Sequence, residues 1–200
     1  MTHAPIRRNP RQGRARATVD AVLEAAAQVL ETKGLKGATT NAIAERAGVS
    51  VGSLYQYFPD KGALVLALYE RHLAQLGEAM DTCFREAEGL PLAEAVRHLI
   101  QGLVAQYQAR PGLQRVLVEE VPHLGGDRRT REAEALLRAR VQSFLEARSR
   151  EVGHPRPDLA ASVIVPVVEA LTHAAAREGR LREAELLPEL TRLVLAYLRG

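Results

Sequence analysis

The sequence predicts an all-α protein of about nine helices, with a small basic N-terminal domain and a larger helical domain. Apolar residues recur at helical spacing along most of the chain. Gly and Pro residues separate these segments at short intervals, and no segment alternates convincingly with the period of a strand. With 200 residues, of which 46% are hydrophobic and 26% charged, the chain is long enough for one large core or two small ones.

The first predicted element follows an arginine-rich stretch, residues 1–16, which has no apolar periodicity and is expected to be a flexible basic arm. A helix is then predicted to begin at Thr18, which serves as its N-cap, and to stop at Gly34. Its apolar residues return at helical spacing between these two positions, so one face is expected to enter a core.

Two short helices are expected next, around a tight turn. The first is capped by Thr39 or Thr40 and ends near Gly48. The second begins after Ser50, whose hydroxyl can accept from N–H groups of the following turn, and Pro59 terminates it.

A long helix is predicted from Asp60, its cap, toward Phe84, until Gly89 and Pro91 interrupt it. Further helices are expected at 92–109, 112–121, 128–151, 158–178 and 183–199. The domain boundary should lie within the long helix, which gives an arm at 1–16, a DNA-binding domain at 17–61 and a ligand-binding and dimerisation domain at 62–200.

Composition excludes several classes of protein. The longest candidate for a membrane span, 159–170, is broken by Ser162 and Pro166, so no membrane partner is expected. The N-terminal arginines precede no apolar segment, which favours a cytoplasmic protein over a secreted one. The single cysteine, Cys83, and the absence of an HExxH pair argue against a disulfide and a structural metal, and no cofactor is expected.

Positive charge is concentrated in the first third of the chain. Residues 1–61 hold nine basic and five acidic side chains, whereas the whole chain has a net charge of only +3. This asymmetry indicates contact with nucleic acid or another anionic surface, although a solvated arginine-rich tail would give the same pattern.

Residues 40–58 have the spacing of a helix-turn-helix, with small residues where the two helices must approach. The second helix then presents short and uncharged side chains that can enter a major groove. At the next helix, Lys61 and the neighbouring backbone N–H groups can hold a phosphate oxygen.

The run from Thr39 to Leu64 (TTNAIAERAGVSVGSLYQYFPDKGAL) resembles the DNA-binding signature of the TetR family of bacterial transcriptional regulators, and the resemblance covers about residues 18–66. It implies a homodimer whose paired second helices bind successive major grooves of a pseudo-palindromic operator. It also implies that a small-molecule effector in the larger domain releases the DNA, as in a repressor.

The resemblance assigns the DNA contacts to Thr40, Ser50, Val51, Gly52, Ser53, Tyr55, Gln56, Tyr57 and Lys61. Of these, Gln56 is the side chain with bidentate capacity toward adenine, which is worth about 1 to 3 kcal/mol against a wrong base. Tyr55 is equally compatible with packing inside the domain, and Phe58 is expected to be a core residue. The basic arm is compatible with minor-groove contact.

The last two predicted helices carry wide apolar stripes that a two-fold contact between copies would cover. The expected dimer residues are Ile164, Val167, Leu171, Leu190, Leu193 and Tyr197. Burial inside one subunit is the alternative.

Effector contacts are only weakly marked in the sequence. The candidates are the bulky or polar residues His98, Tyr107, Glu120, Phe144 and His173. The low aromatic content favours an apolar ligand slightly.

Two other functions compete with a ligand-responsive regulator. Catalytic signatures are missing from the sequence, so an enzyme is not expected. A helical small-molecule-binding protein without sequence-specific DNA binding stays open, because one sequence cannot show that the reading helix is used.

Overall fold

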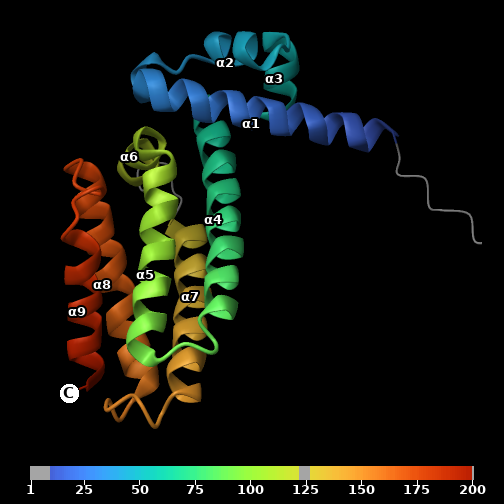
Figure 1. Cartoon of the computed structure of the whole chain (residues 1–200). Helices are drawn as coiled ribbons and strands as arrows, with labels where there is room; N and C mark the ends of the chain where they lie inside the picture. Colours follow the sequence, from blue (N-terminus) through green and yellow to red (C-terminus); the bar gives the residue numbers. More distant parts are fainter. Residues whose placement is uncertain (1–9, 122–126, 200) are drawn as a thin grey trace, which may run out of the picture. The chain divides into compact units, whose positions relative to one another are not determined.

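The computed structural model describes residues 10–121 and 127–199, and the secondary structure in these ranges is helical, which confirms the predicted all-α class (Figure 1). The helices within the described ranges are α1 (Pro10–Gly37), α2 (Thr40–Ala47), α3 (Val51–Tyr57), α4 (Lys61–Glu86), α5 (Leu92–Ala109), α6 (Pro111–Glu120), α7 (Asp127–Ala147), α8 (Pro157–Arg177) and α9 (Leu186–Arg199).

The chain divides into two compact units, residues 1–68 and 69–200, and the division falls inside α4. It lies later than position 61, where the sequence suggested the boundary. The reason is that Leu64, Val65 and Leu68 of α4 are buried and belong to the first unit.

The first helix begins earlier than the sequence predicted. Residues 10–16, expected to be part of a flexible arm, are helical, and residues 1–9 lie outside the described residues. Thr18 is therefore inside α1 and is not its N-cap: its hydroxyl donates to the carbonyl of Arg14 over 2.9 Å. Gly34 does interrupt the helix, with φ 63° and ψ −179°, a conformation that glycine adopts without a steric penalty.

The core of the N-terminal unit is formed by apolar faces of α1, α2, α3 and the start of α4. Ile43 of α2 and Leu54 of α3 are completely buried, as is Val22 of α1. Replacing such a residue by alanine in a closely packed core costs about 2 to 5 kcal/mol. Phe58 is also buried, as expected, so it holds the unit together and does not face solvent.

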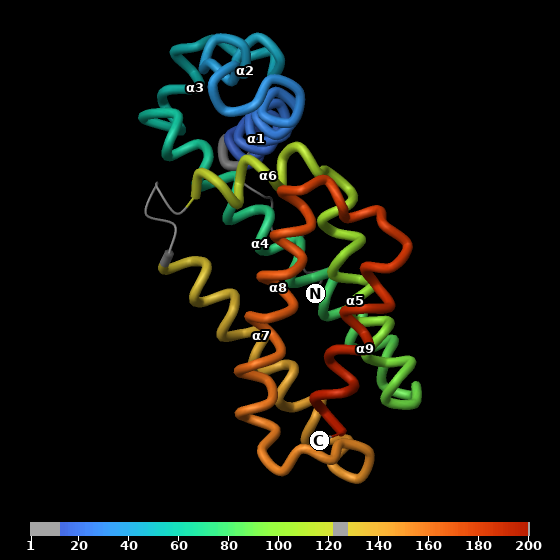
Figure 2. Tube along the Cα trace, turned by 90° about the vertical axis from the view of Figure 1, so that its left-hand side faces the viewer, coloured from blue at the N-terminus to red at the C-terminus, as the bar shows by residue number. Residues whose placement is uncertain are grey.

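In the C-terminal unit, α5 lies beside α9 and α7 lies beside α8, and α8 also contacts α5, α6 and α9 (Figures 1 and 2). The apolar faces of α5, α7, α8 and α9 and of the second half of α4 form one core. Phe84 of α4 meets Phe144 of α7 edge-on, with ring centroids 5.8 Å apart.

Helix α8 is long and apolar enough by composition to cross a membrane, and it continues through Pro166. It nevertheless packs as a core helix of the C-terminal unit, with Ala160, Ile164 and Val168 buried. The packing of the unit thus accounts for one apolar face of α8, while Leu159 and Leu171 on the same helix are exposed.

Candidate nucleic-acid interface and effector cavity

Local hydrogen bonds define the beginning and the end of α2. The sequence offered Thr39 and Thr40 as candidate N-caps. The hydroxyl of Thr39 accepts from the N–H of Ala42 over 3.2 Å, so Thr39 is the N-cap. At the other end Gly48 has φ 68° and ψ 29°, and the N–H of Val49 donates back to the carbonyl of Ala44 over 3.0 Å. These two caps fix the short helix and the turn after it.

Helix α3 begins directly after that turn. Ser50 caps it, because its Oγ accepts from the N–H of Ser53 over 3.0 Å, and the two serine hydroxyls lie 2.8 Å apart. The helix ends at Tyr57, before Phe58 and Pro59, as predicted. Ser50 and Ser53 thus have a structural task at the N-terminus of α3 in addition to the DNA contact that the resemblance assigns them.

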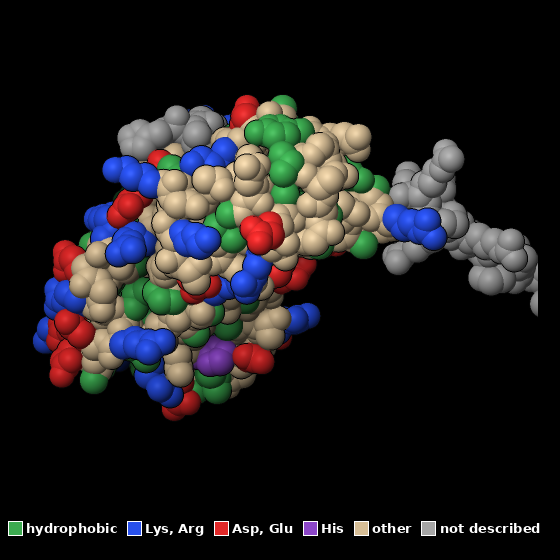
Figure 3. All heavy atoms as spheres, turned by 90° about the horizontal axis from the view of Figure 1, so that it is seen from above, with side chains coloured by type: hydrophobic (Ala, Val, Ile, Leu, Met, Phe, Trp, Pro, Cys, Tyr) green, Lys and Arg blue, Asp and Glu red, His purple; other side chains and the backbone are tan. Residues whose placement is uncertain are grey.

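The outer face of α3 is exposed and free of acidic side chains. Tyr55 is 48% and Tyr57 38% exposed, and Gln56 and Gly52 are exposed as well, whereas Val51 is half-buried. Figure 3 shows the surface seen from above, where tan atoms, which are other side chains and the backbone, lie between separate charged groups. Such a surface can approach phosphates and base edges without charge repulsion.

Thr40 of α2 and Tyr55 of α3 lie next to each other on this unit. The Thr40 hydroxyl is 3.3 Å from the Tyr55 hydroxyl. The tyrosine hydroxyl therefore lies at the surface, next to α2. This position is compatible both with packing inside the domain and with contact to a DNA groove, the two alternatives that the sequence left open.

Lys61, the predicted phosphate anchor, is the first residue of α4. Its Nζ donates to the carbonyl of Leu35 over 2.9 Å. One ammonium group has three donors, so two are left for other acceptors. Asp60 caps the helix as predicted, since its Oδ1 accepts from the N–H of Ala63 over 2.7 Å.

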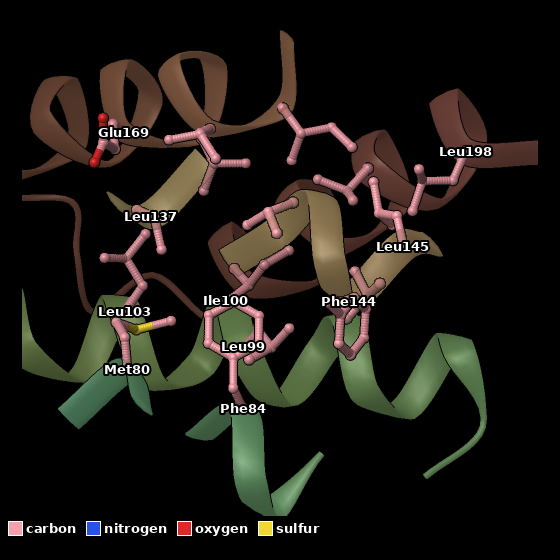
Figure 4. Close-up of a pocket in the computed structure, with 16 residues that line it drawn as sticks. Met80, Phe84, Leu99, Ile100, Leu103, Leu137, Phe144, Leu145, Glu169 and Leu198 are labelled. Atoms are coloured by element: carbon pink, nitrogen blue, oxygen red, sulfur yellow. The ribbon is translucent and has the colours of Figure 1, made fainter. Parts of the chain in front are cut away.

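The C-terminal unit contains two adjoining cavities. The wide cavity has a volume of about 590 Å³ and lies among α4, α5, α6, α7 and α8. The narrow cavity, of about 80 Å³, is lined almost completely by apolar side chains (Figure 4). Both cavities share four lining residues, which are Met80, Phe84, Leu137 and Glu169.

The polar groups of the wide cavity are organised in pairs. The hydroxyl of Tyr107 and Nε2 of His173 share a hydrogen bond of 2.6 Å, and the amide of Gln114 donates to Nε2 of His72 over 2.8 Å. Burial lowers the pKa of His173, with a smaller effect from Arg177, and burial lowers the pKa of His72. Both lowered pKa values favour the neutral imidazole at pH 7, and Nε2 of His72 accepts the hydrogen bond from Gln114.

Glu169 lies where the two cavities adjoin. Among the labelled side chains of Figure 4 it is the one that carries oxygen atoms, and it stands at one end of the apolar lining. Burial raises its pKa to about 7, the negative charge of Glu134 adds to this, and Arg138 opposes it. A carboxyl group therefore sits beside an apolar space and exchanges its proton near neutral pH.

The structure brings three of the five candidate effector residues to the cavities. Tyr107 and His173 line the wide cavity and Phe144 lines the narrow one. His98 and Glu120 line neither cavity: His98 pairs with Glu86, and Glu120 is half-exposed on α6.

Sequence reasoning missed Tyr69, His72, Gln114 and Glu169 as cavity residues. The hydroxyl of Tyr69 pairs with Thr130 over 2.9 Å, a contact between distant parts of the chain with no local signal. For Glu169 a signal was present, because it is an acidic residue inside the apolar run from Ile164 to Leu171.

Two of the expected dimer residues lie in the core of the subunit itself. Ile164 and Leu190 are buried among the core residues of the single chain, and their part in a dimer contact stays a prediction. Tyr197 is half-buried and its ring lies 5.1 Å from that of His154. In contrast, Leu171 is 40% and Leu193 42% exposed, and Val167 is half-buried.

The N-terminal unit has the features of a helix-turn-helix DNA-binding domain: two short capped helices, a glycine turn, and an exposed second helix over a closed core. Residues 22–68 match the family described as bacterial regulatory proteins, tetR family, and residues 91–198 match the tetracyclin repressor-like C-terminal domain. The chain belongs to the TetR family of DNA-binding transcriptional regulators.

Relatives of known sequence include the nucleoid occlusion factor SlmA of Glaesserella parasuis, which is 32% identical over 126 residues, 62% of this chain and 57% of that protein. The HTH-type transcriptional regulator YvkB of Bacillus subtilis is 38% identical over 66 residues, 33% of this chain and 35% of that protein. The chain thus matches less than two thirds of the length of either relative.

Solved structures confirm the fold. A TetR-family regulator from Mesorhizobium loti superposes with a TM-score of 0.75 at 23% identity, over 92% of this chain and 96% of the other. A TetR transcription regulator from Haloarcula marismortui also gives a TM-score of 0.75, at 16% identity, over 92% and 97% of the two chains.

Proposed function

We propose that this protein is a ligand-responsive repressor that binds a pseudo-palindromic operator as a homodimer. The observation that supports this best is the outer face of α3, which is exposed, free of acidic side chains and held by caps at its beginning and in the turn before it. A helix of this kind enters the major groove, and two copies related by a dyad reach two successive turns of DNA. A cytoplasmic location follows from DNA as the partner.

Within this proposal the contacts divide by chemistry. Gln56 reads a base, since its amide can bond to two edges of adenine. The hydroxyls of Thr40, Tyr55 and Tyr57 and the ammonium of Lys61 hold phosphates and position the helix without reading the sequence. A Cβ atom at Gly52 would meet no neighbour closer than 3.9 Å, so space is left there for close approach of a DNA strand to the backbone.

The dimer contact of this proposal uses the exposed and half-buried apolar side chains of α8 and α9. Leu159, Val163, Val167 and Leu171 follow one another at intervals of four along α8, and Leu193 is exposed on α9. Residues four apart share one face of a helix. An apolar helix face of this kind is stable in water when a second copy covers it, and a two-fold axis gives a closed dimer.

The effector of this proposal binds in the wide cavity, whose volume suits a small organic molecule. The apolar lining suits its body, and the paired Tyr107 and His173 and the carboxyl of Glu169 offer hydrogen bonds. Among the described lining residues there are three carboxyl groups, those of Asp81, Glu134 and Glu169, against one guanidinium, so a neutral or basic molecule is favoured over an acid.

Regulators of this family are generally not enzymes, and we infer a binding role for the cavity. A matched pair of probes tests its chemistry: a long-chain primary amine and the carboxylic acid of the same chain length. The amine should bind more tightly in isothermal titration, and Glu169→Gln should reduce the difference. Equal binding of the two would contradict the preference.

Footprinting on the DNA that flanks the coding region tests the regulator proposal itself. We expect protection of two half-sites about one helical turn apart, which Gln56→Ala weakens at defined base pairs. A small-molecule-binding protein without sequence-specific DNA binding would instead give weak, uniform and salt-sensitive protection that Gln56→Ala leaves unchanged. That result would overturn the proposal.

A further inference from the structure

Three side chains with different metal-ligating atoms converge between α4 and α5. They are Cys83 and Glu86 of α4 and His98 of α5, and their sulfur, oxygen and nitrogen atoms all lie within 4.8 Å of one another. The closest pair is Nε2 of His98 and Oε2 of Glu86, 3.0 Å apart. None of the three lines either of the two cavities described above.

The backbone explains why these side chains meet. Cys83 and Glu86 are three residues apart on α4 and therefore lie on the same face, one turn apart. His98 and Gly102 are in the same relation on α5, four residues apart. A Cβ atom at Gly102 would be 2.4 Å from Sγ of Cys83, so the glycine leaves the space into which the sulfur projects.

The three donor atoms of the cluster suit a cation. The sulfur of Cys83, a carboxylate oxygen of Glu86 and a ring nitrogen of His98 lie within 4.8 Å of one another, and each of them can ligate a metal ion. A divalent cation between these groups would take the place of the thiol proton. It would also balance the two negative charges of the thiolate and the carboxylate while the imidazole stays neutral.

We propose that Cys83, Glu86 and His98 form a binding site for a divalent transition-metal ion, with Zn²⁺ the best fit. Thiolate, imidazole and carboxylate are the three protein donors of zinc, whereas Mg²⁺ and Ca²⁺ select oxygen donors. Three protein ligands leave the fourth tetrahedral position for water. The side chains of His98 and Glu86 are 33% and 59% exposed, so the ion has a path from solvent.

The sequence argument against a metal site excluded cysteine-rich clusters and the HExxH pair, and it does not apply to this arrangement. Glu86 and His98 are 12 positions apart and lie on different helices. Only the packing of α4 against α5 brings the donors together. A bound ion would link the end of α4 to α5 and raise the temperature at which the C-terminal unit unfolds.

Co²⁺ is the probe for this site, because it replaces Zn²⁺ and absorbs visible light. The chain contains one cysteine, so a thiolate-to-cobalt charge-transfer band reports on Cys83 alone. With the reduced, tag-free full-length protein, we expect one equivalent of Co²⁺ to give this band together with the intense visible bands of tetrahedral cobalt. Zn²⁺ should then displace the cobalt and bleach the spectrum.

Variants distinguish Co²⁺ bound at the proposed site from Co²⁺ bound unspecifically elsewhere on the protein. Cys83→Ser should remove the charge-transfer band, and His98→Gln should lower the Co²⁺ affinity at least about tenfold, the loss that even an outer-sphere change at a metal site causes. His154→Gln is the matched control, since His154 is half-buried against Tyr197, and it should leave the spectrum unchanged. Circular dichroism checks that each variant is folded.

Two results would overturn the proposal: a cobalt spectrum without the charge-transfer band, or an affinity that His98→Gln does not change. Should Cys83→Ser fail to fold, Glu86→Gln tests the site through the Co²⁺ affinity, which should fall, because Glu86 is exposed and its loss removes a ligand without opening the core. The metal site and the regulator proposal stand or fall separately, since footprinting in the presence of a chelator measures operator binding without the metal.

Discussion

The hydroxyls of Thr40 and Tyr55 lie 3.3 Å apart, one on α2 and the other on α3. Each of the two short helices has its own cap, and this pair adds a contact between them on the exposed side, away from the buried Leu54. In the proposed complex with DNA, both hydroxyls would be available to a phosphate.

Tyr55→Phe removes one hydroxyl of this pair and keeps the ring. We expect the affinity for the operator and for a scrambled duplex to fall by the same factor, since phosphate contacts carry no sequence information. Fluorescence anisotropy with both duplexes measures this ratio. A loss confined to the operator would show instead that Tyr55 contacts a base.

Gly52→Ala separates the contribution of Gly52 to the stability of α3 from its contribution to DNA binding. Alanine is the better helix former by up to about 1 kcal/mol, and the new Cβ meets nothing nearer than Ser50 Oγ at 3.9 Å. The free energy of unfolding in urea should therefore stay the same or rise, while operator affinity falls because the methyl group occupies the space next to DNA. Unchanged affinity would place the DNA backbone or bases farther from Gly52.

Glu169→Gln should change how stability depends on pH. The pKa of Glu169 is raised to about 7 in the folded chain, above its ordinary value of 4.5, so the folded state binds the proton more tightly than the unfolded state. Stability therefore falls as pH rises from about 4.5 to 7, and the loss is complete above pH 7. The glutamine variant lacks this loss.

Urea unfolding of both proteins at pH 5 and pH 8 measures the effect. The variant should be the more stable protein at pH 8, and the difference should shrink at pH 5. A constant difference at the two pH values would show that Glu169 titrates normally. The measurement needs protein without a bound cationic ligand, which would stabilise the ionised carboxylate of the wild type.

Substitutions at Leu171 and Leu193 test whether the proposed apolar face forms the dimer contact. Because both side chains are exposed in the single chain, Leu171→Glu with Leu193→Glu should leave the subunit folded and shift it to a monomer in sedimentation velocity. The monomer should lose most of its operator affinity. Leu136→Glu is the control, since Leu136 is 74% exposed on α7, outside the proposed face, and it should stay dimeric.

The contradicting outcome is a double variant that sediments as a dimer. Leu190 is unsuitable for this test, although the sequence placed it in the interface. It is buried in the subunit core, and a charge there would unfold the unit before it could separate two copies.

Helix caps and turns, which depend on residues close together in the chain, could be predicted from the sequence. Gly48, Ser50 and Asp60 act as expected, because each cap or turn needs only hydrogen bonds within a few residues. Thr18 shows the limit of this reasoning. A threonine hydroxyl can cap the N-terminus of a helix, but inside a helix it can also donate to the carbonyl of the preceding turn, as Thr18 does to Arg14.

Features that depend on the packing of distant segments could not be predicted. A helix that is apolar on two sides does not reveal which side meets its own subunit, and for this reason the sequence did not indicate that Ile164 and Leu190 lie in the subunit core. The cavity is a similar case, since His72 and Gln114 come from different helices and are joined only by the fold.

Met80 is part of the wall shared by the two cavities (Figure 4). A methionine side chain is unbranched and bends easily, so this partition is softer than a wall of valine or isoleucine. A molecule longer than the wide chamber could push the thioether aside and extend its tail beyond it. Selectivity for chain length would then be graded, with a series of homologous compounds accepted by the same protein.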